Sequence, residues 1–84
     1  MSYRVEIVSS AQIQFKKLPA SLRERIAHHL ISLQDNPRPF GSKKLRDTSY
    51  YRLRVGDYRV IYSISDKDRL VKILDTAHRR EVYR

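Results

Sequence analysis

The stretch of sequence that decides the fold spans residues 51–62 and reads YRLRVGDYRVIY. Apolar residues alternate with polar ones on both sides of Gly56-Asp57, with the period of two that is typical of half-buried strands. A Gly-Asp pair between two such runs indicates a tight hairpin turn. We therefore predict a strand that begins at Tyr50, a two-residue turn, and a second strand over residues 58–65.

The turn also determines which side chains lie opposite each other. In a two-residue hairpin Val55 pairs with Tyr58, so Arg54 lies opposite Arg59. Because side chains alternate between faces, Arg52, Arg54 and Arg59 project from one face. Like charges directly opposite each other destabilise a sheet, whereas a bound phosphate turns the repulsion into charge-assisted hydrogen bonds. The face is therefore either a phosphate-binding site or a plain solvated basic surface.

A strand and a short helix are predicted near the N-terminus. Residues 3–8 alternate between apolar and polar side chains, which favours a strand. Ser9 or Ser10 then offers an N-cap for a helix over residues 11–18.

A second helix is predicted after Pro19. Ser21 and Glu24 have the spacing of a capping box at its start, and Asp35-Asn36-Pro37 ends it, because proline disfavours helical geometry in the preceding residue. Its apolar stripe has helical spacing and consists of Leu22, Ile26, Leu30 and Leu33. Histidines 28 and 29 are expected at the surface of this helix.

The remaining elements are a loop over residues 37–47 and a last strand over residues 69–78. The order strand, helix, helix and three strands predicts a two-layer α+β domain, in which the N-terminal strand and the two helices pack on an antiparallel sheet. Residues 1–84 then form one domain. The sequence leaves the place of the N-terminal strand in the sheet open.

Composition indicates a polyanion as the partner. The chain has 18 Lys and Arg against 9 Asp and Glu, which gives a formal net charge of +9, and nucleic acid is the leading partner for such an excess. The chain has no cysteine, and its histidines form no metal-ligand pattern, so neither a disulfide nor a metal site is expected. We find no apolar run long enough to cross a bilayer and no signal-peptide core, and we expect a cytoplasmic protein without a membrane partner.

A second group of chemically active residues lies at the C-terminus. Residues 78–83 read HRREVY, which brings together an imidazole, guanidinium groups, a carboxylate and a phenol. Histidine is suited to moving protons near neutral pH, and tyrosine can stack on a base. The alternative is an exposed basic tail that packs against the sheet through Val82 or Tyr83.

Three stretches together resemble the RelE/ParE toxin superfamily: residues 51–62, the HRREVY run over 78–83, and Lys43-Lys44-Leu45. The resemblance to the RelE branch implies a ribosome-dependent mRNA endonuclease without cofactor or metal. In that family the toxin acts in the ribosomal A site, close to rRNA, and the mRNA 2′-hydroxyl attacks the adjacent phosphate. The resemblance also implies a cognate, RelB-like helical antitoxin that neutralises the toxin.

Roles for single residues follow from the matched motif positions. Arg59 is expected to bind the scissile phosphate and stabilise its developing charge, Arg79 to assist the leaving oxygen or the phosphorane, and Tyr83 to orient the RNA by stacking. Arg52 and Arg54 stand where the best-known relatives have lysines. Because a guanidinium effectively cannot lose its proton, these two residues are expected to clamp phosphate rather than act as bases.

The proton carrier and the outer RNA contacts are assigned more broadly. His78 is the first candidate for the general base and Glu81 the second, and the ribosome is the alternative source of this chemistry. The residues expected to contact the RNA backbone are Lys43, Lys44, Arg46 and Arg80.

Two other functions compete with the nuclease. One is a ParE-like inhibitor of DNA gyrase on the same fold, without RNA cleavage. The other is a basic nucleic-acid-binding module with no activity.

Overall fold

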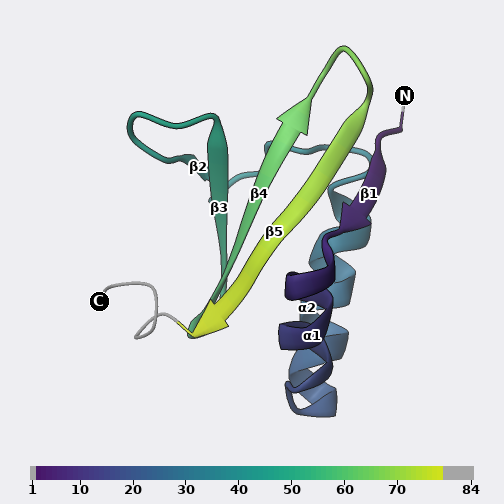
Figure 1. Cartoon of the computed structure of the whole chain (residues 1–84), viewed down its shortest axis with the longest axis vertical. Coiled ribbons are helices and arrows are strands. Elements are labelled where there is room, and N and C mark those ends of the chain that lie inside the picture. Colours follow the sequence, from purple (N-terminus) through teal and green to yellow (C-terminus); the bar gives the residue numbers. More distant parts are fainter. Residues whose placement is uncertain (1, 79–84) are drawn as a thin grey trace.

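The computed structural model describes residues 2–78 and contains a five-stranded sheet in the order β1-β5-β4-β3-β2 (Figure 1). The elements are β1 (Arg4–Ile7), α1 (Ser9–Lys16), α2 (Ala20–Ser32), β2 (Lys43–Lys44), β3 (Tyr50–Val55), β4 (Tyr58–Ser65) and β5 (Leu70–His78). β1 runs parallel to its neighbour β5, and the other adjacent strands are antiparallel. The predicted α+β class is confirmed, and the N-terminal strand lies at one edge of the sheet.

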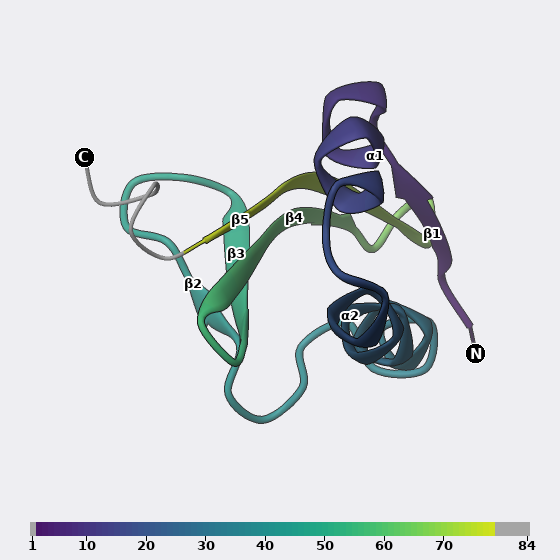
Figure 2. The same cartoon turned by 90° about the horizontal axis from the view of Figure 1, so that it is seen from below.

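Both helices contribute to one core on one face of the sheet. The buried residues of this core are Ala11, Ile26, Leu30, Leu33, Leu53, Val55, Val60, Tyr62, Val71 and Ile73. The strand members alternate with outward-facing residues, as a half-buried sheet requires. Figures 1 and 2 show the helices gathered on the β1 side, with β2 and β3 at the opposite side of the molecule. Neither helix within residues 2–78 has the length and apolar character needed to span a membrane.

The two helices start earlier than the sequence pattern predicts, and neither start uses the expected serine cap. α1 begins at Ser9 with Val8 in the N-cap position, and α2 begins at Ala20 with Pro19 in that position. Neither N-cap has a side-chain hydrogen bond. The predicted Ser21–Glu24 capping box is therefore wrong, because Ser21 already lies in the first turn of α2. Pro19 takes the N-cap position instead, with a ψ of 149° that lies outside the helical range.

The segment after α2 was expected to be a loop over residues 37–47 but includes the short strand β2. Lys43 and Lys44 pair with Arg52 and Tyr51 of β3. A two-residue strand is too short to show the alternation that identifies strands in a sequence.

Side-chain hydrogen bonds fix this segment to the sheet. The buried Tyr62 hydroxyl donates to the Pro37 carbonyl oxygen at 2.8 Å. Arg38 donates to both carboxylate oxygens of Asp66, at 3.2 and 2.9 Å. The segment thus arrives at the β3 edge in a defined position.

Candidate functional site

The β3–β4 hairpin has the register that was predicted by counting outward from the Gly56-Asp57 turn. Val55 pairs with Tyr58, Arg54 with Arg59, and Leu53 with Val60. Leu53, Val55 and Val60 are buried in the core, so the two arginines, which alternate with them, belong to the opposite face of the sheet. The predicted cross-strand arginine pair is confirmed at the level of register.

The neighbouring strands extend this cationic surface. Lys43 of β2 lies opposite Arg52 in the register, which places both on the face that carries Arg54 and Arg59. We call Lys43, Arg52, Arg54 and Arg59 the basic face. The register places it on the face of the sheet opposite the core. Of its three strands, β2 and β3 lie on the side of the molecule away from α1 (Figure 2). Four cations from three adjacent strands can bind an extended polyanion.

The members of the basic face differ in their exposure to solvent. Lys43 and Arg54 are exposed and Arg52 is half-buried, but the exposed fraction of Arg59 is 3%. The alternative of a plain solvated basic surface therefore does not describe Arg59. The strand pattern assigned Arg59 to a face correctly, but it carries no information about what covers that face.

Other predicted residues occupy different places. Lys44 pairs with Tyr51, a residue that packs against the core, so the alternation assigns Lys44 to the helix side of β3. Arg46 is exposed in the turn that joins β2 to β3. His28 and His29 are exposed on α2, as expected.

The C-terminal candidates stand at or beyond the end of the described chain. The backbone of His78 pairs with Tyr58, while Ala77 is the residue opposite Arg59. β5 thus ends beside the β3–β4 turn, near the paired arginines (Figure 1). Arg79, Arg80, Glu81 and Tyr83 lie outside the described residues, and their roles stay predictions.

Two residues on this face were not singled out from the sequence. Asp75 pairs with Ile61, which itself lies opposite Arg52, so a carboxylate belongs to the same face. An irregularity in the β4–β5 register follows this pair, because Tyr62 lies opposite Ile73. Such a bulge cannot be counted from a turn. Tyr50 starts β3 on the same face, and its exposed fraction is 42%.

This arrangement favours electrostatic rather than metal chemistry within the described part of the chain. Residues 2–78 contain no group of three or more histidine or acidic side chains placed to hold a metal ion. Guanidinium groups keep their charge at all physiological pH values and present several donors in a fixed fork. They can bind a phosphodiester and stabilise charge that develops on it.

Comparisons with known proteins agree with this description. Residues 5–83 match the family described as ParE toxin of type II toxin-antitoxin system. The toxin RelE of Mycobacterium tuberculosis is 31% identical, over 98% of this chain and 87% of its own length. The mRNA interferase toxin RelE of Escherichia coli is 28% identical, over 99% of this chain and 92% of its own.

A solved structure gives the same result in three dimensions. The archaeal RelE-RelB complex of Pyrococcus horikoshii OT3 contains a chain with a TM-score of 0.85 and 38% sequence identity, over 94% of this chain and 97% of that one. The similarity covers the hairpin that carries the paired arginines as well as both helices. The chain therefore belongs to the ParE toxin family of type II toxin-antitoxin systems, within the RelE/ParE superfamily.

Proposed function

We propose that this chain is a ribosome-dependent endoribonuclease, the toxin of a toxin–antitoxin pair, and that it cleaves mRNA in the A site. The observation that carries the proposal is the pairing of Arg54 with Arg59, beside Arg52 and Lys43, on the face that the helices leave uncovered. The similar RelE of Escherichia coli is named an mRNA interferase, which supports the same reaction.

The proposed reaction is an internal transfer at phosphorus. The 2′-oxygen bonds to the adjacent phosphorus and the bond to the 5′-oxygen breaks, which leaves a 2′,3′-cyclic phosphate and a 5′-hydroxyl. A base accepts the proton of the 2′-hydroxyl, and an acid donates a proton to the 5′-oxygen. Negative charge rises on the phosphoryl oxygens in the transition state, where fixed guanidinium groups stabilise it.

The solvent exposure of each arginine in the hairpin suggests when it contacts the phosphate. Arg54 and Arg52 reach solvent and are assigned to contact the phosphate first. Arg59, with an exposed fraction of 3%, contacts it after the groups that cover it move. His78, then Glu81, is the proposed base, Arg79 assists the leaving oxygen, and Tyr83 stacks on the RNA.

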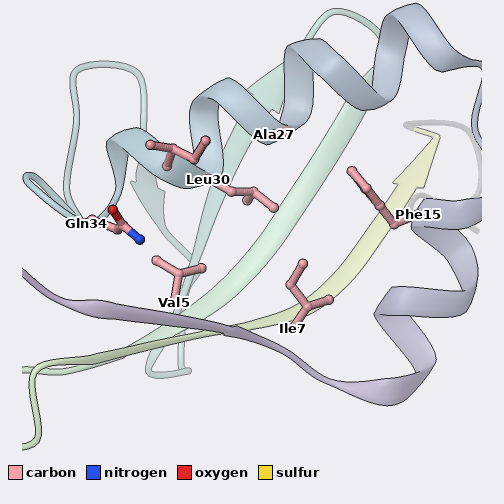
Figure 3. Close-up of a pocket in the computed structure, with 7 residues that line it drawn as sticks. Val5, Ile7, Phe15, Ala27, Leu30 and Gln34 are labelled. Carbon is pink, nitrogen blue, oxygen red and sulfur yellow. The ribbon is translucent and has the colours of Figure 1, made fainter.

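An antitoxin is the second proposed partner. RelE chains similar to this one were solved with RelB. On this chain, β1, α1 and α2 border an open hollow of about 260 Å³ that is lined by Val5, Ile7, Phe15, Ala27, Leu30, Ile31 and Gln34 (Figure 3). A mostly apolar hollow on a chain of net charge +9 suits a helical antitoxin that presents both apolar and acidic residues.

Mapping the 5′ ends of messages in cells that express the chain tests the nuclease. We expect codon-internal cuts with the wild type, and their loss in Arg54→Ala, whose exposed side chain is not part of the core. Lys67→Ala, which removes one positive charge in the distant β4–β5 turn, should cut like the wild type.

The same experiment separates the competing functions. Intact messages accompanied by DNA damage would instead indicate gyrase inhibition. Cells that grow normally while they contain the folded chain would indicate a basic binding module without toxicity.

A further inference from the structure

The first residue of β3, Tyr50, stands out among the tyrosines of the sheet. Tyr51, Tyr58 and Tyr62 pack in or against the core. Tyr50 alternates with Tyr51 and therefore belongs to the opposite face, where 42% of it is exposed. An exposed ring on the basic face of the sheet is placed where it can stack on a bound nucleic acid.

The position of Tyr50 relates it directly to the basic face. Tyr50, Arg52 and Arg54 occupy alternate positions of one strand and so share one side of it. At the rise of a strand, Tyr50 lies about 7 Å from Arg52 and about 13 Å from Arg54 along β3. Aromatic rings set in line with cations on a sheet are the arrangement that binds single-stranded nucleic acid.

The neighbours of Tyr50 hold its backbone in place, and the residue opposite it is small. The residue opposite Tyr50 on β4 is Ser63, whose side chain is small, and Lys72 follows on β5. The Tyr50 amide donates to the Thr48 hydroxyl at 3.1 Å, and its carbonyl accepts from the Leu45 amide at 2.8 Å. A ring on an anchored backbone loses little conformational freedom when a base stacks on it.

We propose that Tyr50 is a substrate-binding residue whose ring stacks on a nucleobase of the RNA, next to the nucleotide whose phosphate Arg52 and Arg54 hold. The inference rests on the proposed nuclease function and adds a residue to its substrate site. The RNA then runs along β3, with its reacting phosphate near the β3–β4 turn and one of its other bases on Tyr50.

The experiment uses the full chain and ribosomes programmed with an mRNA that carries 2-aminopurine in turn at each position of the A-site codon. Methylation of the codon's 2′-hydroxyls removes the nucleophile, so binding is measured without cleavage. A ring that stacks on 2-aminopurine quenches its fluorescence. The variants are Tyr50→Phe, which keeps the stacking ring, and Tyr50→Leu, which keeps only apolar bulk.

We expect Tyr50 to quench the fluorescence at one codon position, in the wild type and in Tyr50→Phe, in addition to any quenching by Tyr83, which all variants retain. Tyr50→Leu should lose that quenching and bind roughly 5- to 150-fold more weakly, the range expected for one stacked base. Phe40→Ala, which removes a fully exposed ring from the segment before β2, should behave like the wild type.

Three outcomes would overturn the proposal. Wild-type affinity and quenching in Tyr50→Leu would show that the ring does not contact the base. Equal losses in Tyr50→Phe and Tyr50→Leu would show that the hydroxyl acts instead of the ring. Failure of the wild type to bind the ribosomes would remove the proposed function itself, and with it the substrate that Tyr50 is meant to hold.

Discussion

Two guanidinium groups that lie opposite each other on adjacent strands repel each other. Arg54 and Arg59 occupy such a pair, one position away from the residues that flank the Gly56-Asp57 turn. The repulsion reduces the stability of the empty protein, and an anion between the two groups removes it. Function and stability therefore make opposite demands on this pair.

Replacing Arg54 by threonine should raise the stability of the protein and abolish its activity. The variant removes the like-charge pair at an exposed strand position and introduces a residue that favours strands, so Tm should rise by up to about 6 °C. Cleavage of mRNA should be lost in the same variant. Lys72→Thr is the matched control, because the register sets Lys72 opposite the acidic Glu6, and its Tm should not rise. A lower Tm for Arg54→Thr, measured by circular dichroism, would contradict the account.

The sequence is informative about this pair because a tight turn determines the register by counting. The pairs Arg54–Arg59 and Leu53–Val60 followed from Gly56-Asp57 alone. The burial of Arg59 could not be predicted in this way, since it depends on groups that reach the face from elsewhere in the fold. The exposure of Tyr50 could not be predicted either, because exposure is a property of the assembled surface and not of the strand pattern.

Packing, rather than capping, explains the helices. Both begin without a side-chain cap, yet each places apolar residues in the common core. The apolar stripe of α2 was predictable because its period persists over several turns, whereas the caps were wrong because they depend on one or two residues. The strand β2 could not be predicted from the sequence, because two residues are too few to show a pattern. The parallel β1–β5 pair could not be predicted either, because it joins segments that are distant in the sequence.

Two neighbouring residues of α2 test the importance of packing. Leu30 has an exposed fraction of 6% and belongs to the core, while Ile31 has one of 62%. Leu30→Ala should cost about 2–5 kcal/mol, because it removes buried methyl groups and leaves a cavity. Ile31→Ala should change the free energy of unfolding by less than about 1 kcal/mol, since most of its side chain is already in water. Equal urea midpoints for the two variants would be inconsistent with this packing.

The Arg38–Asp66 pair, which fixes the segment after α2, should make the free energy of unfolding depend on pH. Hydrogen bonds from Arg38 and then from Tyr3 hold the pKa of Asp66 below its ordinary value. Since the pKa is lower in the folded chain, this contribution is complete above the unfolded pKa of about 3.9 and is lost as the pH falls below it.

Asp66→Asn should therefore have a lower Tm than the wild type at neutral pH, and the difference should shrink as the pH falls below about 4. The effect is expected to be small, because the pair is exposed. Asp35→Asn, which makes the same charge change on the exposed turn that follows α2, provides the control. A difference in Tm that stays constant from pH 7 to pH 3 would show that Asp66 acts through its shape and not through its charge.

Across the whole molecule, apolar and cationic surfaces lie on opposite sides of one sheet. The helices cover the face that holds the core, and the basic face lies on strands at the far side of the molecule (Figures 1 and 2). A net charge of +9 attracts RNA to every part of the chain, so attraction alone does not identify the basic face as the binding site.

Salt dependence can separate site contacts from this general attraction. Each phosphate that a cation neutralises contributes about −0.7 to the slope of log K against log salt for single-stranded RNA. Arg52→Ala and Arg54→Ala should each make the measured slope shallower by about 0.7, if each side chain contacts one phosphate. Lys67→Ala lowers the net charge equally but lies in the β4–β5 turn, at the end of the sheet opposite the β3–β4 turn, and should leave the slope unchanged (Figure 1). Fluorescence anisotropy of a labelled oligoribonucleotide from 50 mM to about 300 mM salt gives all of these slopes. If all three variants changed the slope equally, RNA would be bound by net charge alone, and Arg52 and Arg54 would not be site contacts.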